Sequence, residues 1–125
     1  MLDSSEWDSS REWSERWVRW LLRTVADDWR NERVSRDFFD KLHDRRITRQ
    51  HVRTTLTSQS SYIGHYWYDS HRVGFWDPRS RLFVVWKPNS LHSPSRLMTA
   101  FVYHGDGIAY MQRFTPFREI RGPQQ

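Results

Sequence analysis

The spacing of apolar residues changes near residue 61, and this change constrains the fold more than any other feature of the chain. Upstream, five large apolar residues recur every four positions: Trp13, Trp17, Leu21, Val25 and Trp29. That spacing is typical of one face of an amphipathic helix. Downstream, short aromatic-rich and β-branched segments alternate with a period of two, as strands do. The order predicts an α+β domain, with N-terminal helices packed on one face of a four- to five-stranded antiparallel sheet.

The expected elements follow from caps, turns and periodicity. Ser9 begins a capping box for a first helix that extends to about Asn31. Ser35 and Thr48 are the expected N-caps of two shorter helices. Turn residues at 77–80 and at 104–107 separate the strands, and the second turn predicts a hairpin. The expected strands are 62–68, 72–76, 82–86, 97–103 and a return strand at 108–114.

Alternation in the strand at 97–103 divides its side chains between two faces. We expect an aliphatic set to pack against the helices: Met98, Ala100 and Val102. We expect the other set to form an open face that meets a substrate: Leu97, Thr99, Phe101 and Tyr103.

The charge distribution divides the chain into two unequal parts. Residues 1–32 hold five Arg and eight Asp or Glu, a net charge of −3, and read as a Trp-rich helix. The rest holds fifteen Arg or Lys and seven Asp or Glu, a net charge of +8. We assign residues 33–121 to a basic α+β domain and 122–125 to a frayed tail. A small domain with this excess attracts polyanions, and nucleic acid is the leading candidate partner.

Several function classes are disfavoured by composition. The chain has no cysteine, which excludes disulfides and thiolate metal sites, and its six histidines lack metal-ligand spacing. We therefore expect no metal and no cofactor. No apolar run is long enough to span a membrane, and the N-terminus lacks a signal-peptide pattern. These features favour a cytoplasmic protein without membrane contact, or an effector exported without an N-terminal signal peptide.

Metal-free RNA cleavage suits the side chains that remain. It needs a base to activate the 2′-hydroxyl, an acid for the leaving oxygen, and cations to stabilise the transition state. The catalytic candidates are His65 and His71 for proton transfer, Arg72 and Lys87 for phosphate stabilisation, and Thr99 for positioning. Arginine holds phosphates and aromatic rings stack on bases, which gives five RNA-binding candidates. These are Arg81, Arg96, Phe101, Tyr103 and Arg113.

Residues 37–52, DFFDKLHDRRITRQHV, resemble the helix and R-x-I-[ST]-x-x-x-V opening of RelE-like toxin domains. The segments at 72–75, 82–85 and 98–101 resemble the strands that follow, including a Thr-Ala-aromatic motif. Over residues 35–114 the chain thus resembles the barnase–colicin–RelE-like superfamily. The resemblance implies two helices followed by a four-stranded antiparallel sheet, and a metal-independent endoribonuclease acting on tRNA or mRNA.

The resemblance also implies roles for particular residues. Thr99 matches the Thr of the terminal motif, and Lys87 or Arg72 takes the cationic strand position. Asp37 stands where many members have a histidine, so that the acid–base role either passes to His65 or His71 or is lost.

Together these patterns predict a toxin-type endoribonuclease that cleaves RNA through a 2′,3′-cyclic phosphate. The alternative is a non-catalytic nucleic-acid- or protein-binding module on the same fold. The expected partners are RNA and an acidic antitoxin or immunity protein, since the +8 segment suits such an inhibitor. The Trp-rich helix is expected to pack on its own domain or to mediate self-association.

Overall fold

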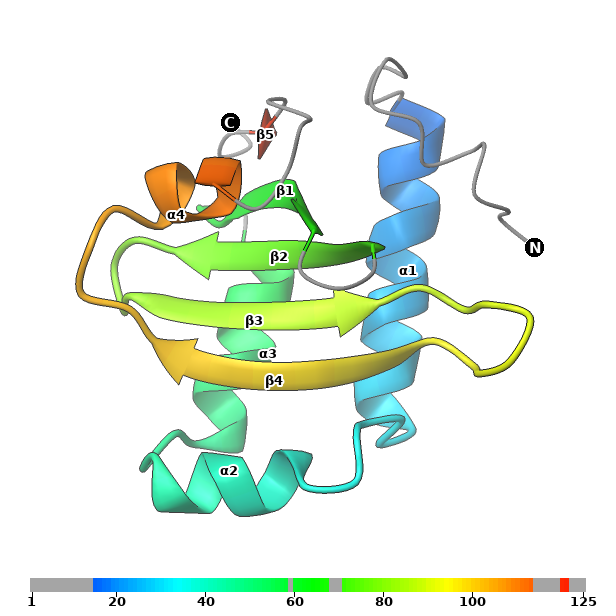
Figure 1. The fold of residues 1–125 in the computed structure, drawn as a ribbon, viewed down its shortest axis with the longest axis horizontal. Coiled ribbons are helices and arrows are strands. Elements are labelled where there is room, and N and C mark those ends of the chain that lie inside the picture. Colours follow the sequence, from blue (N-terminus) through cyan, green and yellow to red (C-terminus); the bar gives the residue numbers. More distant parts are fainter. Residues whose placement is uncertain (1–14, 59, 68–70, 114–119, 122–125) are drawn as a thin grey trace.

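The computed structural model describes residues 15–58, 60–67, 71–113 and 120–121, which form an α+β fold (Figure 1). Helices α1, α2 and α3 come first, followed by strands β1 to β4, helix α4 and strand β5. Their bounds are Glu15–Arg30, Phe38–Asp44, Arg49–Thr57, Tyr62–Trp67, His71–Asp77, Leu82–Lys87, Arg96–Val102, Gly107–Arg113 and Ile120–Arg121. The described strands form one antiparallel sheet in the order β4-β3-β2-β1-β5. The predicted helices-then-antiparallel-sheet architecture is confirmed.

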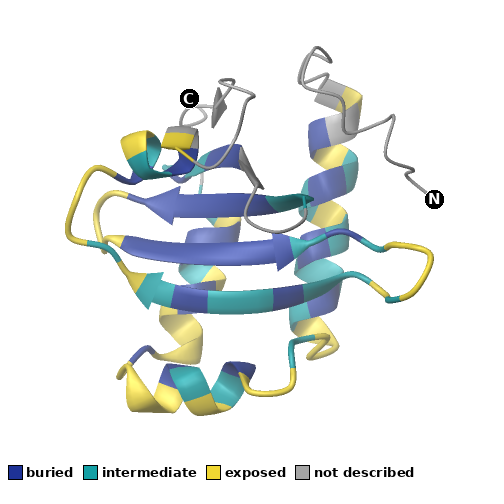
Figure 2. Cartoon of the chain, viewed as in Figure 1, coloured by how far each residue is buried: buried dark blue, intermediate teal, exposed yellow. Residues whose placement is uncertain are grey.

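The main core lies between the sheet and helices α1 to α3. Leu21 and Val25 of α1 are almost fully buried there, in the same cluster as Phe38 of α2 and Val52 of α3. The strands contribute alternate residues to this cluster, and Figure 2 shows the resulting burial of β2 and β3. Each such side chain stabilises the fold by about 1.5–3 kcal/mol on burial. Helix α1 therefore shares one core with the basic segment that follows it.

Aromatic contacts fix α1 and α2 against the rest of the fold. The rings of Trp20 and Trp86 meet edge-on, with centroids 6.4 Å apart. Trp29 packs edge-on against Phe38 at 6.3 Å. Trp13 and the side chain of Trp17 lie outside the described residues, and self-association through this helix stays a prediction.

The predicted caps have different outcomes. Thr48 caps α3 as expected, because its Oγ1 accepts a hydrogen bond from the His51 amide at 3.0 Å. Ser35 does not cap α2, whose N-cap is Asp37. The Ser35 hydroxyl instead donates to the Met98 carbonyl at 2.7 Å. A tertiary contact with β4 thus replaces the local one.

The predicted hairpin at 104–107 and return strand at 108–114 are wrong for the described residues, which form α4 instead. The Asp106 carboxylate accepts hydrogen bonds from the amides of Ile108 at 3.0 Å and Ala109 at 3.2 Å, as an N-cap does. Met111, three residues beyond Ile108, is fully buried. Helix α4 covers part of the sheet face opposite α1 to α3 (Figure 1). That face was expected to be open, and it is only partly so.

A β-bulge changes the predicted faces of β4. Val85 pairs with Thr99 but Trp86 pairs with Leu97, and this shift leaves Met98 as the extra residue. Leu97 therefore faces the helices, while Met98 packs in the cluster on the α4 side. Both residues were expected on the opposite faces. The expectation holds for Ala100, which is in the helix-side core. It also holds for Phe101 and Tyr103, which pack in the cluster on the α4 side, and for Thr99, which pairs with Val85 of that cluster.

The outer edge of β4 is covered by other parts of the chain. The backbone of Leu97 donates to the Arg33 carbonyl at 2.9 Å and accepts from the Ser35 amide at 2.7 Å. Farther along, the Arg45 side chain donates to the Ala100 carbonyl at 2.8 Å. The polar backbone groups at these positions of the edge strand are thus satisfied.

Candidate nucleic-acid interface

An arginine from the end of α2 meets the threonine of the terminal strand motif. Arg45 Nη1 donates to Thr99 Oγ1 at 3.0 Å and to the Ala100 carbonyl at 2.8 Å. The first bond joins residues 54 positions apart, one from the helical motif and one from the strand motif. Thr99 was a predicted site residue, whereas Arg45 was not. Arg45 could not be recognised as the partner of Thr99 from the sequence, because the contact depends on α2 lying beside β4.

The guanidinium of Arg45 keeps a free edge for a ligand. Its two hydrogen bonds within the described residues both use Nη1, which leaves Nε and Nη2 available. That edge presents two parallel N–H groups, a geometry that matches two oxygens of one phosphate. Arg45 is exposed, so an incoming phosphate can reach it. Arg45 and Thr99 together form a candidate anion site at the sheet edge.

Three cations lie in a row across β2, β3 and β4, on the side of the sheet opposite α1 to α3. Lys87 of β3 pairs directly with Arg96 of β4. Arg72 of β2 precedes Val73, whose partner is Trp86, so the same register brings Arg72 opposite Lys87. All three are half-buried.

Like charges directly opposite each other destabilise a sheet. Among the described residues neither Lys87 nor Arg96 forms an ion pair, and Arg96 donates only to the Pro94 carbonyl, at 3.2 Å. A polyanion bound along this row would relieve the repulsion between the two strands.

The remaining RNA-binding candidates gather at the α4 end of the sheet. Arg113 Nη2 donates to the Tyr103 hydroxyl at 2.9 Å, and the Tyr103 and Tyr110 rings lie 4.6 Å apart. Arg81 donates to the carbonyls of His104 at 2.9 Å and Gly105 at 3.3 Å. Arg81 therefore ties two loops together, whereas the exposed Arg113 lies over the Tyr110 ring at 5.5 Å, beside Tyr103.

The predicted proton-transfer residues do not join this group. His71 is on the helix side by alternation with Val73 and Phe75, while its neighbour Arg72 is on the other side. His65 pairs with Val73, and its side chain lies outside the described residues. No histidine side chain of the described chain bonds to Thr99, Lys87 or Arg96.

Asp37, at the position where the resemblance implies a histidine, lies on the surface of α2. Its carboxylate forms an ion pair with Lys41 one turn later, at 3.2 Å. That contact is an ordinary helical surface pair.

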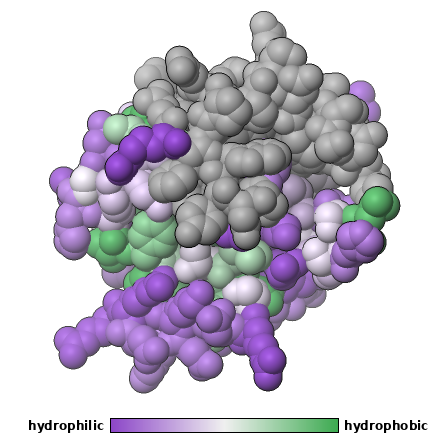
Figure 3. Space-filling model, in the orientation of Figure 1, coloured by the Kyte–Doolittle hydropathy of each residue, from purple (hydrophilic) through white to green (hydrophobic). Residues whose placement is uncertain are grey.

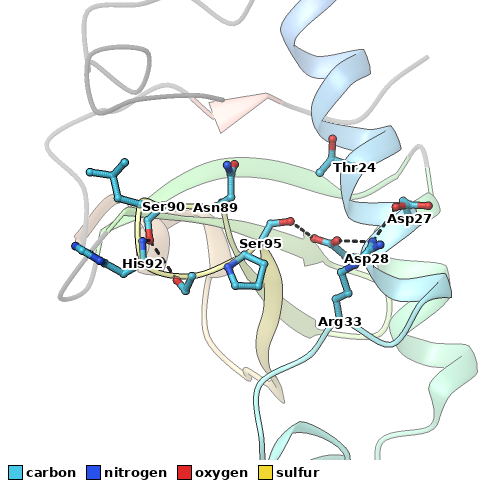
Figure 4. Close-up of a pocket in the computed structure, with 11 residues that line it drawn as sticks. Thr24, Asp27, Asp28, Arg33, Asn89, Ser90, His92 and Ser95 are labelled. Carbon is cyan, nitrogen blue, oxygen red and sulfur yellow. Dashed lines mark hydrogen bonds and ion pairs between the residues drawn. The ribbon is translucent and has the colours of Figure 1, made fainter.

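A separate pocket of about 610 Å³ lies between the C-terminal end of α1 and the β3–β4 connection (Figure 4). At its base, the Asp28 carboxylate is only 2% exposed and has three partners. It accepts from Trp86 Nε1 at 2.8 Å, from the Ser95 hydroxyl at 2.6 Å and from Arg33 Nη1 at 3.1 Å. These contacts fasten α1 to β3 and to the loop before β4, so the role of Asp28 is structural.

Arg33 also bonds the neighbouring Asp27 at 2.8 Å, and this hydrogen bond holds the pKa of the Asp27 carboxyl below its usual value. The buried role of Asp28 was not predicted from the sequence, although the sequence contains an indication of it. Two consecutive carboxylates in the last turn of a helix oppose its dipole and therefore imply cationic or hydrogen-bonding partners.

The chain matches no protein-family model, no curated protein and no solved structure. Within the described ranges, no group of three or more His, Asp or Glu side chains is placed to hold a metal ion. No helix in that part of the chain has the length and apolar character needed to cross a membrane. The functional proposal therefore depends on the residues of this chain alone.

Proposed function

We propose that this domain binds RNA on the sheet face opposite α1 to α3 and cleaves it as a metal-independent, toxin-type endoribonuclease. The observation that carries the proposal is the contact between Arg45 and Thr99, which leaves the Nε–Nη2 edge of Arg45 open at the sheet edge. The cationic row of Arg72, Lys87 and Arg96 supports it, because adjacent phosphates of one strand would find cations on the same face.

In the proposed reaction the scissile phosphate occupies the Arg45 edge. The ribose 2′-oxygen loses its proton and forms a bond to phosphorus, while the bond from phosphorus to the 5′-oxygen breaks. The 5′-oxygen takes up a proton, and the other product carries a 2′,3′-cyclic phosphate. Arg45 would stabilise the charge that develops on the phosphate oxygens. Thr99 would hold the guanidinium in place, and the proton-transfer residues are left unassigned.

The first test is RNA cleavage by the purified protein in EDTA, with detection of 2′,3′-cyclic phosphate ends. We expect Arg45→Ala and Thr99→Ala to lower the cleavage rate, the first by about 100-fold, as for loss of one transition-state donor. Arg23→Ala is the matched control, since Arg23 is an exposed arginine on α1. Cleavage that is equally fast in all three variants would contradict the assignment.

A second candidate function is a non-catalytic RNA-binding module on the same fold. One observation favours it: no described histidine bonds to Thr99, Lys87 or Arg96. RNA that stays intact in the same assay, yet binds with strong salt dependence, would support this candidate over the enzyme.

The cationic row makes a prediction that holds for both candidates. Replacing Lys87 by Gln removes one phosphate contact, so the slope of log affinity against log salt should become shallower by about 0.7 for single-stranded RNA. Titrations at several salt concentrations measure this slope, with Arg23→Gln as the charge-matched control. An identical slope for Lys87→Gln and wild type would remove Lys87 from the interface.

A further inference from the structure

Phe101 occupies an unusual position on the outermost described strand. Its ring stacks on that of Phe83, its cross-strand partner on β3, with centroids 5.3 Å apart and planes inclined by 12°. Strand β4 ends the sheet order, and β3 lies on its inner side. One face of the Phe101 ring is therefore covered by Phe83, and the opposite face points outward, beyond the sheet edge.

The outward ring face belongs to an apolar strip on β4. The strip consists of Met98 and Phe101, which are both half-buried and lie on the α4 side of the sheet. Tyr110 meets the Phe101 ring edge-on at 6.0 Å and an angle of 77°, so it does not stack on the outward face. Figure 3 shows hydrophobic surface in this region, between the strongly hydrophilic surface of α2 and that of α4. The strip is small, and its largest apolar surface is the aromatic ring.

The strip adjoins the anion site. Phe101 follows Thr99 by two residues, so the two side chains share a face at a separation of about 6.6 Å along the strand. Arg45 reaches this point from outside the sheet edge, on the side to which the outward ring face points. A flat apolar surface thus lies beside a bidentate phosphate donor, at a spacing that suits the base and the phosphate of one nucleotide.

We propose that the outward face of Phe101 is a nucleobase-stacking subsite, with the phosphate of the same nucleotide held by Arg45. The proposal rests on the proposed function, since it presupposes RNA binding, and it names the substrate class. A base can stack there only if it has left its own helix, because both faces of a base are covered within a duplex. The substrate is therefore single-stranded RNA, or an unpaired loop, at this position.

The test is equilibrium binding of labelled 2′-O-methyl oligonucleotides, which lack the attacking hydroxyl, measured by fluorescence anisotropy. Wild-type protein should bind a single strand more tightly than a duplex of equal length. Phe101→Leu should weaken single-strand binding by about 5- to 100-fold, as for loss of one base–aromatic stack, and leave duplex binding unchanged. Phe101→Tyr should keep the affinity. Val102→Ser is the control, because Val102 pairs with Leu82 and so lies on the opposite face of β4, and it should bind single strands as tightly as wild type does.

A second measurement needs no protein variant, so it does not depend on the folding of Phe101→Leu. Oligonucleotides with one base removed at successive positions should lose affinity sharply at a single position. Equal losses at all positions, or equal binding of duplex and single strand, would overturn the stacking subsite while leaving RNA binding intact. Wild-type protein that binds neither oligonucleotide would instead overturn the proposed function.

Discussion

Replacing Asp28 with alanine should destabilise the protein by about 3 kcal/mol. The substitution leaves the buried Trp86 indole N–H without its acceptor and removes a charged acceptor from Ser95 and Arg33. Unsatisfied buried donors and lost charge-assisted bonds each cost about 1–3 kcal/mol, and here both occur at one site. For a chain of this length the loss corresponds to a melting temperature lower by about 10 °C.

The neighbouring carboxylate provides the control for this prediction. Asp27 has the same charge and also bonds Arg33, but its side chain is 50% exposed. Asp27→Ala should therefore cost less than about 1 kcal/mol, as is typical of surface ion pairs. Urea denaturation of the two variants measures the difference directly. Equal losses of unfolding free energy in the two variants would mean that the buried hydrogen bonds of Asp28 stabilise the protein no more than a surface ion pair does.

Replacing Gly107 with alanine should displace α4 and destabilise the protein by about 2 kcal/mol. A Cβ atom at this position would lie 2.2 Å from the Trp76 ring, far inside van der Waals contact. The gain in helix propensity of alanine over glycine, at most about 1 kcal/mol, is smaller than the usual cost of forcing extra atoms into a packed site. Circular dichroism melts would measure the net loss.

A double variant isolates the cause of that loss. In a Trp76→Leu background the obstructing ring is absent, so Gly107→Ala should cost much less than it does alone. Ala109→Gly, on the exposed side of the same helix, should show only the propensity effect. If Gly107→Ala costs the same free energy in both backgrounds, a clash with Trp76 is not what makes alanine unfavourable at position 107.

The sequence sufficed for the features that depend on local chemistry. The Thr48 cap and the turn at Asp77 were predicted correctly, and in that turn the Arg81 amide donates to the Asp77 carbonyl at 2.8 Å. Short runs rich in aromatic and β-branched residues, bounded by turn residues, located β2, β3 and β4.

Two of the errors, at Ser35 and at Met98, come from contacts between segments that are distant in the sequence. The bulge at Met98 arises from how β3 pairs with β4, so it cannot be read from the sequence of either strand. The site shows the same limit: Thr99 was identified from its motif, but Arg45 gained its role only through a contact across 54 positions. The third error has a local cause: helix α4 was mistaken for a return strand, because seven residues are too few to separate the helical period from the strand period.

The covered edge of β4 restricts how this protein meets its partners. The segment at 33–35 and the Arg45 guanidinium occupy the backbone groups that an added strand would need there. Strand addition at this edge, whether by a second copy or by an extended peptide, would first have to break those bonds. An inhibitor that approaches β4 must therefore recognise side chains, and the protein is protected there against edge-to-edge aggregation. Arg45 supplies part of this cover through its bond to the Ala100 carbonyl, so Arg45→Ala would remove the proposed phosphate contact and also expose this part of the edge.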